Sequence, residues 1–154
     1  MGGRAGRASR GAGATGAVLE RLILDTTVLI AAERGGTSVD ERIGDDDDVT
    51  IAAITAAELL VGELLATGRR RRANRRAFIG DLLATVPVEP YDLVVARAHA
   101  ELLAHTSRTG TPRGAHDLLI AATARAHRRT VVTADLAGFD GLPDVSVRHV
   151  AVNE

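Results

Sequence analysis

Two hydrophobic patterns alternate along the chain. Short runs of consecutive apolar residues are typical of strands buried on both faces of a sheet, and apolar residues recurring every three or four positions are typical of amphipathic helices. The first pattern predicts strands at 18–24, 49–51, 86–88, 130–133 and 145–150. The second predicts helices at 27–33, 55–66, 69–83, 91–106 and 116–127, and a short helix from Ser38. Strands alternating with helices favour an α/β domain with a mostly parallel sheet.

The amino-terminal segment differs from the rest of the chain. Residues 1–17 are rich in Gly, Ala and Arg, show no apolar periodicity and bury too little surface to offset the entropy of ordering. We therefore predict a disordered tail over residues 1–17 and one domain over residues 18–154. No run reaches the roughly 18 uncharged apolar residues of a membrane helix, which predicts a cytoplasmic protein without a membrane partner.

The composition excludes several kinds of chemistry. The chain has no Cys, which excludes disulfide staples, iron–sulfur clusters, Cys-ligated zinc and thiol catalysis. The five histidines show no spacing typical of a zinc site. The basic residues are all Arg, and the formal net charge is −1.

Four acidic residues lie where strands end or helices begin. Asp25 follows the first strand, Glu58 lies in the first turn of the helix after the second strand, Asp117 begins an apolar helix, and Asp135 follows the strand at 130–133. Ligands of open parallel sheets bind outside the carboxyl ends of the strands. We therefore expect these four carboxylates to converge on one edge of the domain.

Such a convergence requires a counterion. Two carboxylates about 4 Å apart repel each other by roughly 4 kcal/mol at an effective dielectric constant near 20. Mg²⁺ or Mn²⁺ relieves this repulsion, because hard divalent cations prefer oxygen ligands. A site of this kind can activate water and stabilise an in-line displacement at phosphorus.

Each acid also has a structural interpretation. Thr55 and Glu58 match a capping box, with Thr55 as the N-cap and Glu58 at the third helical position. Asp117 and Asp135 could cap helices, favoured by the helix dipole, and Asp25 could cap the helix at 27–33. Singly these signals are weak, and it is their joint placement that favours a functional site.

Four segments carry a resemblance to a known family. They are LDTTVL at 24–29, TAAELLVG at 55–62, HDLLIAATA at 116–124, and VTAD at 132–135 followed by Phe139. In this order they resemble the PIN-domain ribonucleases, specifically the VapC-type toxins of bacterial toxin–antitoxin pairs. The resemblance spans about residues 18–150, which is all of the chain except the tail.

The resemblance implies a fold, an activity and a set of site residues. The fold would be a PIN-like three-layer α/β/α domain, and the activity a cleavage of RNA that depends on Mg²⁺, with Mn²⁺ as a possible substitute. Asp25 and Asp117 would be the principal metal ligands, and Glu58 and Asp135 would complete the acidic cluster, partly through water. Thr133 would orient a carboxylate or the attacking water.

The resemblance also implies partners. The usual partner is a small VapB-like antitoxin whose tail enters the acidic groove, and toxins of this family commonly form homodimers. The chain departs from the family at Thr27, where relatives often carry Asn or Ser. The fourth acidic position, here Asp135, varies in the family.

Two charged runs have competing interpretations. Arg69–Arg72, Arg75 and Arg76 place six guanidinium groups in eight residues, which is either an RNA-backbone patch or a solvated helix face. The run Asp45–Asp48 is interpreted as a solvated turn rather than a second metal site.

Two further features have both a structural and a functional interpretation. His116 adjoins Asp117 and is either a substrate contact or a surface residue at a helix start. The helix at 91–106 carries an apolar stripe, which we interpret as core-facing, although the same stripe could contact an antitoxin or a second copy. The stripe consists of Leu93, Val94, Ala98, Leu102 and Leu103.

Three functions compete on these observations. A metal-dependent endoribonuclease toxin accounts for the four acids and the resemblance. A phosphoryl-transfer domain forming an aspartyl-phosphate on Asp25 or another Asp at a strand end is disfavoured, because such domains typically use a Lys and this chain has none. A non-catalytic PIN-fold module that binds RNA or a partner is the remaining alternative, and the presence of all four acids argues against it.

Overall fold

The computed structural model describes residues 19–35, 44 and 46–152. The predicted tail over residues 1–17 and the short helix predicted from Ser38 fall outside the described residues. Five parallel strands form one sheet in the order β3-β2-β1-β4-β5. Their bounds are Arg21–Leu24 for β1, Asp48–Ala52 for β2, Val88–Glu89 for β3, Thr130–Thr133 for β4 and Ser146–His149 for β5.

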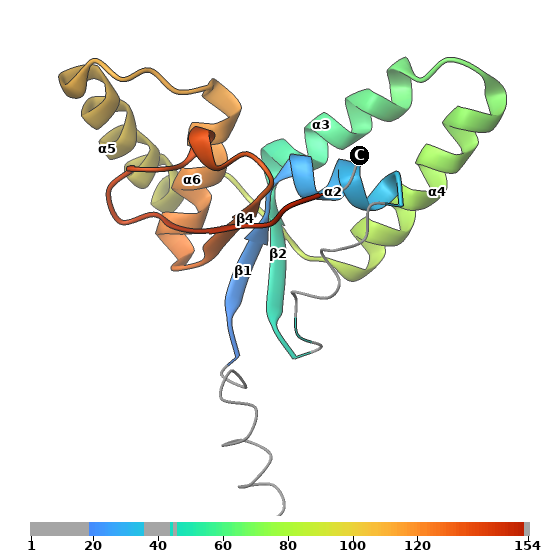
Figure 1. Cartoon of the computed structure of the whole chain (residues 1–154), viewed down its shortest axis with the longest axis horizontal. Helices are drawn as coiled ribbons and strands as arrows, with labels where there is room; N and C mark the ends of the chain where they lie inside the picture. Colours follow the sequence, from blue (N-terminus) through green and yellow to red (C-terminus); the bar gives the residue numbers. More distant parts are fainter. Residues whose placement is uncertain (1–18, 36–43, 45, 153–154) are drawn as a thin grey trace, which may run out of the picture.

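Helices cover both faces of this sheet, which confirms the predicted three-layer α/β/α architecture (Figure 1). They are α2 (Thr26–Glu33), α3 (Ala53–Leu65), α4 (Arg69–Thr85), α5 (Leu93–Thr109) and α6 (Ala115–His127), with a 3₁₀ turn η2 (Leu136–Gly138). None of the helices in the described ranges is both long and apolar enough to cross a membrane.

The core is divided by the sheet because successive strand residues point to opposite faces. Ile23 of β1 packs with buried residues of α5 and α6. Its neighbours Leu22 and Leu24 pack with buried residues of α2, α3 and α4. The uninterrupted apolar runs of the central strands are therefore explained by burial on both faces.

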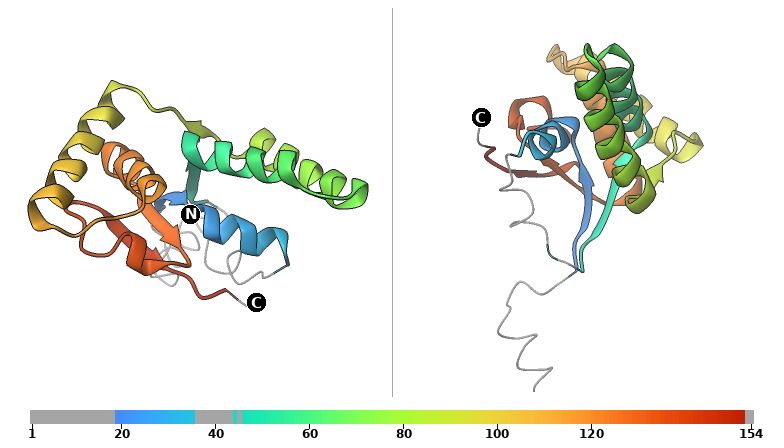
Figure 2. Two further views of the ribbon diagram at one scale, coloured as in Figure 1. Left: turned by 90° about the horizontal axis from the view of Figure 1, so that it is seen from above. Right: turned by 90° about the vertical axis from the view of Figure 1, so that its right-hand side faces the viewer.

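Helices α3 and α4 form a hairpin that extends away from the sheet (Figures 1 and 2). Arg75 of α4 connects the hairpin to the domain: its guanidinium donates to the carboxylate of Glu33 at 3.0 Å and to the carbonyl of Gly62 at 3.2 Å. The remaining outer face of α3 is apolar and exposed, at Leu60, Val61, Leu64 and Leu65.

The predicted capping box at Thr55 is wrong. Helix α3 begins at Ala53, directly after β2, and its N-cap Ala52 makes no side-chain capping bond. Thr55 is therefore the third helical residue, fully buried and with its hydroxyl unpaired within the described part of the chain. Glu58 lies in the second turn rather than the first, which removes the capping interpretation of its carboxylate.

Helix α5 begins two residues later than predicted, because Asp92 is its N-cap and accepts a bond from the N–H of Val95 at 3.1 Å. The apolar stripe faces the core at Ala98 and Leu102 only. It is exposed at three other positions, where the core-facing prediction is wrong: Leu93, Val94 and Leu103.

The strands begin at an edge held by ion pairs. Arg129 is buried at 7% exposure and donates to the carboxylate of Glu89 at 2.7 Å and to the carbonyl of Asp48 at 3.0 Å. Asp48 also pairs with Arg21 at 3.1 Å. Within the predicted acidic turn, Asp47 accepts bonds from two backbone N–H groups. Asp47 and Asp48 therefore have structural partners rather than being merely solvated, and Asp45 lies outside the described residues.

Candidate active site

The four predicted acids lie together at the carboxyl edge of the sheet. Asp25 directly follows β1 and Asp135 lies two residues beyond β4, while α3 and α6 supply Glu58 and Asp117 from their amino-terminal halves. Burial raises the pKa of the Asp117 carboxyl, and repulsion from the charges of Asp25, Asp135 and Glu58 raises it further. The other three carboxylates are thus close enough to Asp117 to repel its charge.

Asp25 is buried at 3% exposure and held by three donors. It is the N-cap of α2, where its Oδ1 accepts from the N–H of Thr26 at 2.8 Å. Its Oδ2 accepts from the hydroxyls of Thr27 and Thr133, each at 2.8 Å. This carboxylate therefore has one fixed orientation, and it serves as a helix cap and as a site residue at once.

The two threonines also connect Asp25 to the loop after β4. The Thr133 hydroxyl accepts from the N–H of Asp135 at 2.9 Å, and the Thr27 hydroxyl accepts from the N–H of Ala134 at 3.1 Å. Thr27, the position where the chain departs from the family pattern, thus supplies a hydroxyl that joins α2 to this loop. Thr133 contacts the Asp25 carboxylate, in line with the orienting role expected from the sequence.

Glu58 is held at both of its carboxylate oxygens. Its Oε1 accepts from the Thr26 hydroxyl at 2.7 Å, and its Oε2 accepts from Nδ1 of His116 at 2.7 Å. Sequence analysis did not predict either contact. The one available signal was that His116 adjoins Asp117 at the start of a helix. These bonds join α2, α3 and α6 around the acidic cluster.

Asp117 and Asp135 are the free carboxylates of the cluster. Neither side chain accepts a hydrogen bond from the residues that the structure describes. The N-cap of α6 is Gly114, so Asp117 lies in the first turn of the helix and does not occupy the N-cap position. Asp135 precedes η2 without a side-chain capping bond. Neither carboxylate therefore makes a capping hydrogen bond, although Asp135 occupies the N-cap position of η2 and Asp117 lies in the first turn of α6.

Gly138 has no side chain, and the Asp117 carboxylate lies where a side chain at position 138 would be. A Cβ atom built on Gly138 would lie 2.6 Å from Oδ2 of Asp117, well inside van der Waals contact. The glycine therefore sets where this carboxylate can point, and nothing in the sequence pattern indicated it.

The raised pKa of Asp117 predicts a pH-dependent stability. Its pKa in the folded protein lies above the ordinary value of 3.8, so the folded state binds the proton more tightly than the unfolded state does. Ionised Asp117 therefore destabilises the metal-free protein at neutral pH, and this penalty disappears as the pH falls through the folded pKa toward 3.8. Asp117→Asn should be more stable than the wild type at neutral pH, by a margin that shrinks on acidification.

Chemical denaturation of both proteins in a chelator, across the range from neutral to acidic pH, measures that margin. Acid unfolding caused by other carboxylates is common to both proteins and cancels in the difference. A margin that grows on acidification would contradict the raised pKa.

The site's chemistry fits a hard divalent cation. Its donors are carboxylate and hydroxyl oxygens, two of the carboxylates have no hydrogen-bond donor among the described residues, and their mutual repulsion is relieved by positive charge. No group of three or more Asp, Glu or His side chains within the described ranges is arranged to hold a metal ion. Magnesium can be held by one or two carboxylates, because it keeps several of its waters.

Comparisons with known proteins agree with this geometry. The sequence pattern of the PIN domain matches residues 22–143. Ribonuclease VapC5 of Mycobacterium tuberculosis is 36% identical over 83% of this chain and 94% of its own length. Ribonuclease VapC of Rickettsia bellii is 29% identical over 86% of this chain and 98% of its own length.

A solved structure shares the fold. It is VapBC-5 of Mycobacterium tuberculosis, from the VapBC family of toxin–antitoxin systems, with a TM-score of 0.71 and 33% identity over 84% of this chain and 98% of that one. The four acids, the three-layer fold and these relatives agree, and the chain belongs to the PIN-domain family, among the VapC ribonucleases.

Proposed function

We propose that this protein is an endoribonuclease toxin that hydrolyses RNA phosphodiester bonds with Mg²⁺ held by Asp25 and Asp117. The observation that carries the proposal is the convergence of four carboxylates, where burial and then the charges of the other three raise the pKa of Asp117. Such a cluster is costly for a protein that binds only RNA, because carboxylates repel phosphates. A hydrolytic site explains why the protein keeps a carboxylate cluster despite this repulsion.

The side chains divide the work between them. Asp25 and Asp117 would hold the metal, and Glu58 and Asp135 would act on its waters. Thr133 and Thr27 hold the Asp25 carboxylate from the side opposite Thr26, so that it need not reorient when substrate arrives. A bound divalent ion would supply charge against the scissile phosphate and lower the pKa of water. The expected products carry 5′-phosphate and 3′-hydroxyl ends.

The proposal includes the protein's partners and location. We place the protein in the cytoplasm, with a VapB-like antitoxin whose tail enters the acidic site. A homodimer is also proposed, and the exposed residues Leu93, Val94 and Leu103 of α5 are apolar surface available for such an interface.

A cleavage assay tests the proposed function. Purified protein free of antitoxin should cut a mixed-sequence RNA with Mg²⁺ or Mn²⁺, and lose this activity in EDTA. Restoring Mg²⁺ should restore cleavage, and sequencing the products should find 5′-phosphate ends. RNA binding without cleavage at any Mg²⁺ or Mn²⁺ concentration would instead favour the non-catalytic module.

Gly138→Ala should lower the rate of cleavage with little loss of stability. The added methyl group must displace the Asp117 carboxylate, and a misplacement of about 1 Å in a catalytic group can cost roughly 100-fold in rate. The carboxylate is the free end of a side chain and can move aside, so the fold should persist.

Initial cleavage rates and melting temperatures measure the two effects. Gly80→Ala is the matched control, since a Cβ on Gly80 meets nothing within 4 Å. Full activity in Gly138→Ala would show that the Asp117 carboxylate tolerates displacement, and would weaken its role as a ligand.

A further inference from the structure

The six arginines of α4 are not equivalent in the structure. Two of them are used by the fold: Arg75 binds Glu33 and Gly62, and Arg72 donates to the carbonyl of Ala66 at 3.1 Å. The other four are exposed and make no hydrogen bond or ion pair with any described residue. These four, Arg69, Arg70, Arg71 and Arg76, are called the free arginines below.

Three of the free arginines are placed where they disfavour the helix. Arg69, Arg70 and Arg71 lie in the first turn of α4, at the positive end of the helix dipole, where cations are unfavourable and acids are preferred. The first turn contains no acid, and the N-cap Gly68 makes no side-chain capping bond. Helix stability therefore gives no reason for this cluster, whereas a polyanionic ligand would relieve its repulsion.

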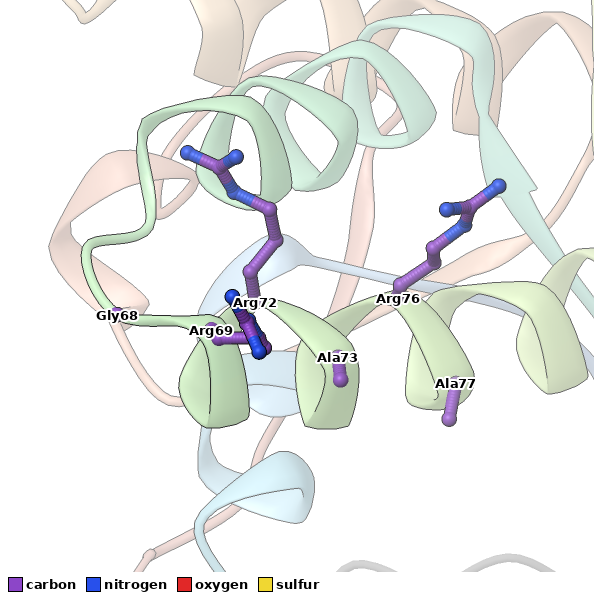
Figure 3. Close-up of a pocket in the computed structure, with 6 residues that line it drawn as sticks. All are labelled: Gly68, Arg69, Arg72, Ala73, Arg76 and Ala77. Atoms are coloured by element: carbon purple, nitrogen blue, oxygen red, sulfur yellow. The ribbon is translucent and has the colours of Figure 1, made fainter.

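A hollow on α4 is lined by two of the free arginines, Arg69 and Arg76, and by Arg72. It measures about 630 Å³ and is lined by Gly68, Arg69, Arg72, Ala73, Arg76 and Ala77 (Figure 3). Arg72 and Arg76 extend from one side of α4 with their guanidinium groups apart, and the small side chains of Ala73 and Ala77 lie on the other side of the helix (Figure 3). Guanidinium groups bind phosphate through two parallel N–H bonds, at a small cost in conformational entropy for each bond.

The hairpin links this hollow to the acidic site. Helix α3 begins at the sheet edge and carries Glu58 in its second turn, while the turn into α4 lies at the far end of the hairpin (Figure 1). The acidic site itself repels phosphates, so affinity for RNA must come from positive charge elsewhere. We propose that the free arginines of α4 bind the phosphate backbone of the RNA substrate, away from the bond that is cut.

This inference rests on the proposed function for the identity of the polyanion, and it has a distinctive consequence. The free arginines contribute to binding only when the RNA is long enough to reach them from the acidic site. A substrate of two or three nucleotides should not depend on it. Long RNA should bind more tightly than short RNA, and the difference should depend on salt.

The test is binding of labelled single-stranded RNA to the whole protein in EDTA, where no cleavage occurs. The variant is Arg69→Gln with Arg76→Gln, which removes two free arginines from the hollow and keeps helix-favouring side chains. The matched control is Arg97→Gln with Arg108→Gln on α5, because both residues are exposed and have no partner among the described residues. The two double variants have the same net charge.

We expect the α4 variant to bind an RNA of about 20 nucleotides roughly tenfold more weakly at low salt, and the control less than about twofold more weakly. The slope of log affinity against log salt should fall by about 1.4 in the α4 variant, because each of the two phosphates that it no longer neutralises contributes about 0.7 to the slope. With Mg²⁺, the α4 variant should show a raised KM for the long RNA and an unchanged kcat on a trinucleotide.

Two outcomes would overturn the proposal. One is equal weakening in both double variants, which would reflect net charge alone. The other is unchanged RNA binding by the α4 variant, and abolished binding of a polyglutamate peptide by the same variant would then assign the surface to an acidic protein. Because these measurements use EDTA, RNA binding at the α4 surface with no cleavage in Mg²⁺ would refute the proposed function and leave this surface intact.

Discussion

Replacing Asp25 with Asn should reduce RNA cleavage by about 10³-fold, the equivalent of roughly 4 kcal/mol of transition-state stabilisation. The substitution removes the charge of the most firmly held carboxylate in the site while preserving its size. The Asn side chain can still accept the N–H of Thr26, and the hydroxyls of Thr27 and Thr133 can rotate to accept from the new amide. The fold should therefore survive the loss of activity.

Asp117→Asn should abolish cleavage to the same extent, because this carboxylate is the second proposed metal ligand. In bacteria, either variant should also relieve any growth arrest that the wild-type protein causes. Asp46→Asn is the matched control, since this exposed turn residue precedes β2 at the opposite end of the strands. Wild-type cleavage in either Asp25→Asn or Asp117→Asn would make the assignment of the site wrong.

Replacing Arg129 with Leu should destabilise the protein by about 3 kcal/mol without altering the chemistry of the site. The guanidinium is buried, and its removal leaves the largely buried Glu89 carboxylate without its cation. The carbonyls of Leu22 and Asp48 also lose the hydrogen bonds that this guanidinium donates. Uncompensated buried charges of this kind are among the most destabilising consequences of a single substitution.

Urea denaturation of the wild type and of Arg129→Leu measures this loss. Because the damage arises from the stranded Glu89 charge, adding Glu89→Leu should restore more than half of the missing free energy of unfolding. Arg129 precedes β4 at the edge opposite the acids, so kcat measured well below the melting temperature should be unchanged. A loss below about 1 kcal/mol would show that the ion pair contributes little beyond its desolvation cost.

The acidic cluster was predictable because of a property of parallel sheets. Asp25 and Asp135 follow their strands within two residues, so naming the strands was enough to place both carboxylates at one edge. Asp117 followed from the recognisable helix that begins beside it. The prediction needed only local patterns and one rule of topology.

The contacts around Glu58 were not predictable on the same basis. Its two partners, Thr26 and His116, are 32 and 58 residues away along the chain, and no local pattern relates them. The start of α3 was missed for a different reason. Ala52 and Ala53 carry no capping group that would mark where the helix starts. Thr55 therefore resembled an N-cap in the sequence, although it lies inside the helix. Exposed apolar residues such as Leu93 cannot be distinguished from core residues by periodicity, because both belong to one helical stripe.

The most direct test of the account is a crystal structure of the wild-type protein soaked in Mn²⁺, with anomalous data collected to locate the ion. We expect an anomalous peak in contact with the carboxylates of both Asp25 and Asp117. An empty cluster at a saturating concentration of Mn²⁺, or a peak ligated by other residues alone, would contradict it.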